Sequence, residues 1–562
     1  MGLPLSPFQT LPMLVVCKVV EYLEGRSTNS FELSATEHHE RKVILTPLLL
    51  VSERWRTAAL ESICDNCELA FIHSRRAFEV RFPAWPADYS YPRFRKTHLV
   101  KQITVSAFLW KDMCDGAFCD VAAMPQYESM SFPAAKTISL VLHKTTDKDS
   151  SSASVTSQEK VVAFTRSLLQ FTPIVASVIV KFESVSNAAS YNEQLYGALI
   201  SELYQGRVSS VDVYSGLNGT PLSLSLTGTT GLTSIAHGSN ISCAPFASLA
   251  HLNARTLKTL EIIISEEKNW LDLLYGGTET PTAYTSLTTL VVEITNIPYD
   301  AIWAAIEDGE PFPVLSTLVV EGKYPFNDGL LFRGNGKTLQ SLSIPFSAIA
   351  RNVLGRFSVL KRSGVARMAQ ICIDDVTEMD TEFLAGRAGV PIEQQVHRIL
   401  EVATLLDYTG DTTNAQTFSS IKTAPTTAIL QHLRISKLQC SVTDFIKMIV
   451  ALPSLVSFTC DIHAFGPDIE EIPANDRPSI LRAKYYPLSS NFRVLRVPDI
   501  ADGLVSMVAD AAKIIAVLCP NFAQVDLSLK LRNEFSREVA WAMVSDPFEP
   551  YADSLRRLVY RG

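Results

Sequence analysis

The hexapeptide Leu257-Lys258-Thr259-Leu260-Glu261-Ile262 is the most informative stretch about the fold, because variants of it recur at short intervals along the chain. The clearest are Leu287-Thr288-Thr289-Leu290-Val291-Val292, Leu315-Ser316-Thr317-Leu318-Val319-Val320 and Leu339-Gln340-Ser341-Leu342-Ser343-Ile344. The steps from Leu260 to Leu290, Leu318 and Leu342 are 30, 28 and 24 residues. Alternating apolar and polar residues over so short a run are typical of a half-buried β-strand. The spacing therefore predicts one strand per repeat.

The same pattern predicts strands on both sides of this stretch. They lie at 99–105, 137–142, 177–182, 208–213, 430–435, 455–460, 492–497, 522–527 and 555–560. Segments between them have helical spacing of apolar residues, at 158–170, 192–205, 299–307, 442–451 and 503–518. Strand, helix, strand at this period predicts a parallel sheet with helices on one side, in which stacking buries the apolar faces.

The first sixty residues carry a different pattern, which predicts two helices. Thr10 can cap the first helix and Pro12 suits its first turn. A polar segment at 26–42 is expected to be an inserted loop. Pro47 opens the second helix, which we expect to continue from Ala58 to Phe71. The apolar positions of the two helices include Leu11, Leu14, Val15, Val19, Leu23, Leu48, Leu49, Val51, Trp55 and Leu60.

This N-terminal pattern resembles the F-box. The elements that match are Leu11-Pro12, Val15-Val16, Val19-Val20, Tyr22-Leu23 and Val51-Ser52-x-x-Trp55-Arg56. The sequence departs from the family at Met13, where a polar residue is common, and in the length of its inserted loop. The repeats are similar to the leucine-rich repeats that often follow an F-box, although the usual asparagine ladder is mostly absent.

The resemblance implies a role in ubiquitin ligation. An F-box docks on a Skp1-like adaptor within a cullin complex, while the repeats hold a target protein. The residues that would bind the adaptor are Leu11, Pro12, Val15, Val16, Val19, Val20, Leu23, Val51 and Trp55. Apart from the resemblance, ten scattered cysteines, several of them in apolar runs, favour a reduced protein with cytoplasmic or nuclear localisation. The alternative is a non-catalytic leucine-rich-repeat scaffold, whose N-terminal helices only cap the solenoid.

The expected fold class is α/β, with a small N-terminal helical F-box-like module followed by a leucine-rich-repeat solenoid. Such a solenoid is a curved parallel sheet with outer helices. The module is expected at 1–62, a connector rich in proline and aromatic residues at 63–97, and the solenoid at 98–562. A longer insertion is expected near 380–427, with a helix around 392–406. The serine-rich segment 144–157 is expected to be a loop.

The candidate target-binding residues come from the strand pattern. Residues between the leucines of each strand alternate outward, so they should form a polar stripe on one face of the sheet. The stripe is predicted to contain Glu261, Glu293, Glu321, His432, Arg434, Asp461, Arg496 and Asp526. Acidic residues in its middle and mixed charges beyond would suit a polar or charged protein partner. The alternative is that these residues only keep the sheet soluble.

Composition and motifs narrow the functional classes. With 562 residues, 47% of them apolar, the chain is expected to fold as several domains or one extended array. A net charge of −8 without a basic cluster argues against nucleic acid or an anionic membrane as partner. The uncharged residues 1–10 do not predict a secretory signal. The pair Cys64 and Cys67 has no second pair to complete a zinc site. We find no phosphate-binding or catalytic motif, so neither enzymatic activity nor a cofactor or metal is expected, although triads can assemble from distant residues.

Overall fold

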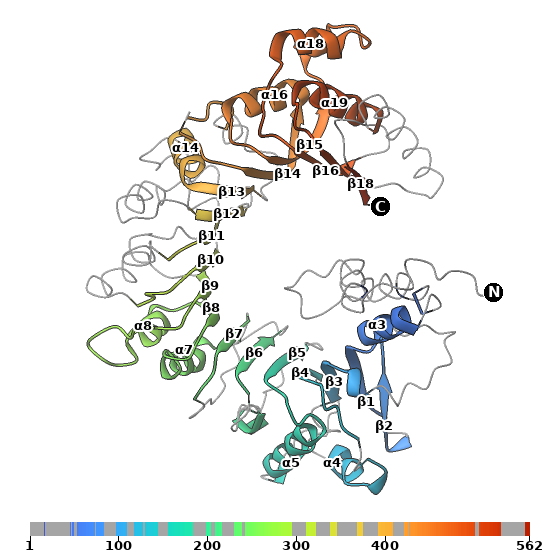
Figure 1. Ribbon diagram of the computed structural model, residues 1–562. Coiled ribbons are helices and arrows are strands. Elements are labelled where there is room, and N and C mark those ends of the chain that lie inside the picture. Colours follow the sequence, from blue (N-terminus) through green and yellow to red (C-terminus); the bar gives the residue numbers. More distant parts are fainter. Residues whose placement is uncertain are drawn as a thin grey trace, which may run out of the picture. The chain divides into compact units, whose positions relative to one another are not determined.

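The computed structural model divides into two compact units, residues Met1–Ile263 and Ile264–Gly562. Figure 1 shows their secondary structure. The structure describes residues 16, 45, 48–49, 53–72, 75–83, 97–108, 117–127, 130–143, 156–183, 198–199, 201–203, 208–215, 230–238, 242–294, 311–321, 338–345, 368–374, 392–408, 421–425, 427–500, 505–529 and 557–561.

Unit 1 contains a ladder of strands that pair mostly in parallel. From β3 onward each strand pairs with the next one along the chain, while β1 pairs in parallel with β3 and antiparallel with β2. The strands are β1 (Asn66–Ile72), β2 (Ala77–Arg81), β3 (Gln102–Phe108), β4 (Thr137–His143), β5 (Ser177–Glu183), β6 (Ser210–Ser215), β7 (Ser234–His237) and β8 (Thr259–Ile264).

Unit 2 contains a second ladder, in which every pairing is parallel and follows chain order. Its strands are β9 (Thr289–Ile294), β10 (Thr317–Glu321), β11 (Ser341–Pro345), β12 (Met368–Asp374), β13 (Ala403–Tyr408), β14 (His432–Ser441), β15 (Ser457–Ala464), β16 (Val494–Ile500), β17 (Gln524–Leu529) and β18 (Arg557–Arg561). Parallel pairing in chain order is the arrangement of a solenoid, so each unit has a mostly parallel, repeat-like α/β fold.

Helices join many of the strands, and in Figure 1 α4, α5 and α7 of unit 1 lie on one side of its strands, whereas α3 lies beside β1 at the start of the ladder. In unit 2, α14, α16 and α19 lie next to the strands, and α18 lies further out, against α19. The helices of unit 1 whose bounds lie in the described residues are α3 (Glu53–Ile63), α4 (Ala117–Ala122), the 3-10 helix η5 (Pro125–Tyr127), α5 (Thr156–Phe171) and α7 (Cys243–Leu252). Those of unit 2 with described bounds are α8 (Glu267–Tyr275), α14 (Ile392–Val402), α16 (Val442–Ala451), α17 (Pro467–Glu470), α18 (Arg477–Tyr485) and α19 (Val505–Leu518).

One backbone contact recurs before the strands of both units. The carbonyl of Thr288 accepts hydrogen bonds from two consecutive N–H groups of the next repeat, Ser316 and Thr317, both at 2.9 Å. A single carbonyl thus fixes where the following strand begins. The carbonyls that accept two N–H groups in this way are those of Asp65, Lys101, Lys136, Ala176, Ser209, Thr233, Thr288, Ser316, Gln431, Val456 and Arg493.

The core of unit 2 is built on a row of aliphatic and aromatic side chains in register across the strands. Each member is at most 2% exposed. The row consists of Leu290, Leu318, Leu342, Ile371, Leu406, Leu433, Phe458, Leu495 and Val525. Since a fully buried leucine contributes about 1.5–3 kcal/mol, each repeat adds stability only when a neighbour covers it. The leucine pattern of the sequence encodes this row.

The predicted strands are confirmed, and others were missed. Every predicted strand segment overlaps an observed strand, and the helices expected at 158–170, 442–451 and 503–518 correspond to α5, α16 and α19. The helix expected at 299–307 lies outside the described residues, as does the loop at 26–42 and all but 156–157 of the loop at 144–157. The strands that the sequence pattern missed are β1, β2, β7, β12 and β13.

Two expected helices are wrong at their ends. The helix expected from Ala58 to Phe71 ends at Ile63, and the chain forms β1 from Asn66. The helix expected to reach residue 406 ends at Val402, because 403–408 form β13 between β12 and β14. In both places pairing with neighbouring strands overrides the local apolar spacing. Strands therefore occur inside the segments 63–97 and 380–427, which the sequence pattern alone predicts to be a connector and an insertion.

Candidate interaction surface

The candidate site is the polar face of unit 2, which we define as the strand positions whose side chains alternate with the buried row. On β14, Leu433 and Ile435 are buried, while His432 is half-buried and Arg434 is exposed. β15 repeats this with Phe458 buried on one side of the strand. Because successive side chains on a strand point to opposite faces, the polar residues lie on the side away from the buried row.

A row of polar and charged residues runs straight across five strands of this face. It consists of Asp407, Arg434, Thr459, Arg496 and Asp526, which are in register on β13, β14, β15, β16 and β17. The arginines are two strands apart, roughly 10 Å along the sheet. An acid flanks each of them on the outer side, so the row reads acid, base, hydroxyl, base, acid.

Both arginines contact their flanking acids. Arg496 Nε donates to Asp526 Oδ2 at 3.0 Å, and Arg434 Nη1 donates to Asp407 Oδ2 at a longer 3.4 Å. The arginine side chains are 40% and 45% exposed, while the aspartates are 11% and 21% exposed. The acids are thus embedded and the guanidinium groups extend outward. A guanidinium has five N–H donors, so each retains donors for carboxylate or phosphate groups of a partner.

Asp526 is held from two sides. Its Oδ1 accepts a hydrogen bond of 2.7 Å from Gln524 Nε2, and its Oδ2 accepts that of Arg496. A carboxylate bonded on both oxygens has little rotational freedom. Asp526 therefore orients Arg496 rather than offering itself to a partner.

His432 lies in the adjacent row, next to the arginines. Its Nδ1 is 2.8 Å from Ser457 Oγ, a hydrogen bond whose donor depends on the histidine tautomer. Burial lowers the pKa of His432, and the positive charges of Arg496 and Arg434 lower it further. The ring is therefore neutral at pH 7, and it contributes a hydrogen-bonding group rather than a third positive charge.

The remaining predicted target-binding residues divide between the units. Asp461 is half-buried on β15, on the same side as Thr459. Glu293 is half-buried on β9, and the backbone of Glu321 is in register with it on β10. Glu261 belongs to β8 in unit 1, so the two units each carry part of the predicted stripe.

Unit 1 buries an acid beside Glu261. Asp212 on β6 and Glu261 on β8 flank Ala236 in one register row, and Asp212 is only 7% exposed. Ser210 Oγ donates to Asp212 Oδ1 at 3.4 Å. Burial, reinforced by the negative charge of Glu261, raises the pKa of Asp212 to about 6. This face of unit 1 is thus less solvated at β6 than the arginine-bearing face of unit 2.

Two of the predicted adaptor-binding residues are described by the structure, and both are buried. Val16 is helical and 0% exposed, and Trp55 on α3 is 6% exposed. Arg56 Nε, from the same helix, donates to the carbonyl of Leu49 at 3.0 Å and so ties α3 to the segment before it. The other predicted adaptor-binding residues lie outside the described parts, namely Leu11, Pro12, Val15, Val19, Val20, Leu23 and Val51.

Metal and thiol chemistry find little support in the described part of the chain. Cys64 and Cys67 are both buried, and burial raises the pKa of the Cys67 thiol well above its ordinary value. A thiol that keeps its proton is a poor metal ligand and a poor nucleophile. Among the described residues no group of three or more His, Cys, Asp or Glu side chains is arranged to hold a metal ion. None of the described helices is both long and apolar enough to cross a membrane.

Comparison of the chain with protein-family models finds no match, and comparison with curated proteins finds none either.

Sequence reasoning missed several residues of the polar face. Asp407 was missed because β13 was not predicted, although Leu405-Leu406-Asp407 has the same alternation as its neighbours. Ser457 and Gln524 lie within predicted strands and are the first residues of β15 and β17, where the register pairs them with His432 and Val494. Each of Asp407, Ser457 and Gln524 is next to a member of the buried row, so the register of that row would have placed all three on the polar face.

Proposed function

We propose that this chain is a substrate-recognition subunit of an SCF-type ubiquitin ligase. The observation that carries the proposal is the order of its parts. An F-box-like pattern, from Leu11-Pro12 to Trp55-Arg56, directly precedes a long parallel strand–helix array with a charged face. The F-box-like segment docks on a Skp1-like adaptor, which links the chain to a cullin. The array holds a target protein for ubiquitylation, as leucine-rich repeats do in proteins of this type.

The chain itself performs no chemistry in this role. Binding a target beside a charged conjugating enzyme raises the effective concentration of its lysines near the thioester. The proposal therefore requires two separate binding surfaces and no active site.

The polar face of unit 2 supplies the target-binding surface. Arg434 and Arg496 are held by embedded acids and extend toward solvent, which suits recognition of carboxylate or phosphate groups on a protein. Because arginines fixed in this way lose little conformational entropy on binding, they discriminate by geometry as well as by charge.

The burial of Val16 and Trp55 removes these two residues from the proposed adaptor-binding surface. Side chains exposed by 0% and 6% stabilise the N-terminal segment internally. We therefore assign the direct adaptor contacts to the remaining apolar residues of the F-box-like pattern, above all Leu11, Val15 and Leu23.

The alternative function is a scaffold whose N-terminal helices cap the array. One observation favours it: α3 runs almost directly into β1, and Cys64 N–H bonds to the Leu60 carbonyl at 2.9 Å at the junction. The buried face of α3 carries Trp55, Leu60 and Ile63, as a cap that covers the end of a sheet would.

Capture by an immobilised Skp1-like adaptor separates the two functions. We expect the purified intact chain to bind the adaptor, and a Val15→Asp, Leu23→Asp variant to remain folded but unbound. A scaffold would instead fail to bind in its wild-type form, and its variant would lose the fold of the first repeats. Circular dichroism of both proteins provides the folding control.

A further inference from the structure

Between β15 and β16 the chain forms more structure than a repeat requires. The neighbouring connections from β14 to β15 and from β16 to β17 each show one helix in their described residues, α16 and α19, whereas this one contains both α17 and α18. The two helices lie outside the layer that covers the sheet, with α17 against α16 and α18 against α19 (Figure 1). Only Leu481 of α18 is buried, so the core of unit 2 gains little from this helix.

The added helices are nevertheless held firmly in place. Gly466, with a positive φ of 89°, lets the chain turn against α16, where a Cβ would come within 2.6 Å of Thr443 Oγ1. The Phe465 carbonyl accepts hydrogen bonds from Thr443 N–H and Oγ1, both at 3.1 Å. Arg477 Nε donates to the carbonyls of Ile469 and Ile472 at 3.1 and 3.0 Å. Arg477 also lies 4.4 Å from the Phe465 ring centroid, so the start of α18 is fixed to α17 and to the turn at Phe465.

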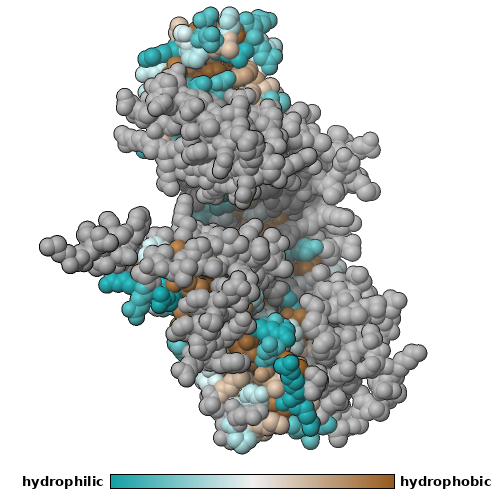
Figure 2. All heavy atoms as spheres, turned by 90° about the vertical axis from the view of Figure 1, so that its right-hand side faces the viewer, coloured by the Kyte–Doolittle hydropathy of each residue, from teal (hydrophilic) through white to brown (hydrophobic). Residues whose placement is uncertain are grey.

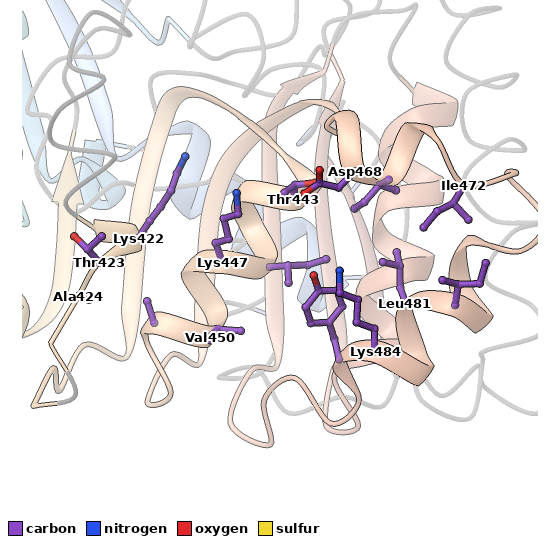
Figure 3. Close-up of a pocket in the computed structure, with 15 residues that line it drawn as sticks. Lys422, Thr423, Ala424, Thr443, Lys447, Val450, Asp468, Ile472, Leu481 and Lys484 are labelled. Carbon is purple, nitrogen blue, oxygen red and sulfur yellow. The ribbon is translucent and has the colours of Figure 1, made fainter.

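The added helices α17 and α18 form part of the wall of a pocket of about 690 Å³. Volumes of about 300–1,000 Å³ are typical of small-molecule sites. The pocket lies between α16, α17, α18 and residues 422–424, and Figure 3 shows its lining from these elements. The apolar side chains of the lining are aliphatic, namely Ile446, Val450, Ile469, Ile472, Ile480 and Leu481.

Part of this aliphatic lining is open to solvent. Val450 on α16 is 59% exposed and Ile480 on α18 is 46% exposed, among the largest exposures of apolar side chains in the described residues. At the top of Figure 2, where α18 lies in Figure 1, hydrophobic patches are visible between hydrophilic residues. Exposed aliphatic side chains that line a pocket are a favourable contact for an apolar ligand.

The rim of the pocket is predominantly cationic. Lys422, Lys447 and Lys484 contribute to the lining, against the single acid Asp468. Lys422 is paired with Asp444 at 2.5 Å, which leaves Lys447 and Lys484 as the exposed cations. Figure 3 shows Lys447 on α16, with Val450 further along the same helix, and Lys484 on α18 beside Leu481. An occupant with a negative group at one end would match this distribution.

We propose that this pocket binds a single-chain aliphatic carboxylate, with the chain against Ile446, Val450 and Ile480 and the carboxylate between Lys447 and Lys484. The aliphatic lining favours a flexible hydrocarbon body over a planar aromatic one, since Tyr485 is the one aromatic ring that lines it. The rim lysines favour an anionic head over a cationic or neutral one. This binding is independent of adaptor or target recognition, because it uses the outer helices.

Calorimetric titration of the intact chain with dodecanoate, below its micelle-forming concentration, tests the proposal. We expect saturable binding at one molecule per chain. Butyrate has the same head without the long chain, and dodecyltrimethylammonium has the same chain with the opposite charge. Each should bind at least tenfold more weakly. Equal affinity for the cationic amphiphile, or no saturable binding of dodecanoate, would overturn the proposal.

Variants locate the site on the chain. Ile480→Asp places a carboxylate on the exposed side of α18 and should weaken dodecanoate binding at least tenfold. Val314→Asp changes another exposed apolar residue of unit 2, 38% exposed and not part of the pocket lining, and should leave the affinity unchanged. The double variant Lys447→Glu, Lys484→Glu should weaken dodecanoate and strengthen the cationic amphiphile, whereas Lys136→Glu in unit 1 should do neither. Wild-type affinity in the Ile480→Asp variant would assign the binding to another surface.

Discussion

Arg496 on β16 donates a hydrogen bond from Nε to Oδ2 of Asp526 on β17, across 3.0 Å and between residues that are directly in register. The guanidinium is 40% exposed and the carboxylate 11%. Solvent therefore screens the pair, and its value for stability is small, about 1 kcal/mol or less. Its main consequence is orientational, because a carboxylate also bonded by Gln524 fixes the direction of the arginine.

A double-mutant cycle tests whether the Arg496–Asp526 pair is partly solvated and contributes little to stability. Arg496→Gln and Asp526→Asn, singly and together, should give a coupling free energy of about 0.5–1 kcal/mol in urea unfolding, because the arginine is partly solvated. The coupling should decrease as salt is raised from low to near-molar concentration. A coupling of about 3 kcal/mol that is insensitive to salt would instead indicate a buried pair essential to the fold.

Asp212 makes the stability of unit 1 depend on pH. Its pKa is raised from 3.8 to about 6, so between these values the folded chain holds a proton that the unfolded chain has lost. The free energy of unfolding therefore falls as pH rises from about 4 to 6, and the charged carboxylate costs roughly 3 kcal/mol above that range.

Asp212→Asn should remove this cost. We expect the variant to be more stable than the wild type at pH 7, by up to roughly 3 kcal/mol, and equally stable at pH 3.5. Urea unfolding of both proteins across this range provides the measurement. A constant difference at all pH values would show that Asp212 does not titrate between 4 and 6.

Gly466 and Gly277 form a matched pair for backbone strain. Both have a positive φ, 89° and 83°, but only at Gly466 would a Cβ meet other atoms, including Thr443 Oγ1 at 2.6 Å. Gly277→Ala should cost about 1 kcal/mol from the left-handed backbone alone. Gly466→Ala should cost more, about 2–4 kcal/mol, because it also displaces α17 from α16. Equal losses of stability in thermal unfolding would contradict the close approach at Gly466.

Leu433 tests the continuity of the buried row. Its side chain is 0% exposed and in register with Leu406 and Phe458, so Leu433→Ala should destabilise unit 2 by about 2–5 kcal/mol. Thr459→Ala removes a half-buried side chain from the polar face of the adjacent strand and should cost about 1 kcal/mol or less. If the two variants unfolded at the same urea concentration, the row would not be the core of the array.

The strands could be predicted wherever the sequence repeats the leucine that begins each of them. Leu257 and Leu287 precede β8 and β9, are fully buried, and recur at a nearly constant distance from the next buried residue. At β12 and β13 this leading leucine is missing, since Met368 and Ala403 stand three residues before the buried Ile371 and Leu406. β12 and β13 form because they pair with each other and with the edges of β11 and β14. Neighbouring strands, rather than the local sequence, therefore determine these two strands.

The candidate surfaces were predictable only in part. Alternation placed His432, Arg434 and Arg496 on one face, because period-two patterns determine which side of a strand a residue occupies. The pairing of Arg434 with Asp407 depends on register between strands, which a single sequence does not encode directly. The pocket beside α18 was not predicted at all. Its lining comes from three helices and a loop, and nothing local in Val450 or Ile480 distinguishes them from core residues.

The proposed role in ubiquitin ligation is tested most directly by the affinity of the intact chain for a purified Skp1-like adaptor, measured by titration. We expect saturable one-to-one binding by the wild type. Binding should be about 100-fold weaker, or roughly 3 kcal/mol, for the Val15→Asp, Leu23→Asp variant, since both aspartates would enter an apolar contact. Arg434→Glu, a change on the polar face, should leave the affinity for the adaptor unchanged. Absence of binding by a folded wild-type chain would rule out adaptor docking and favour the capped scaffold.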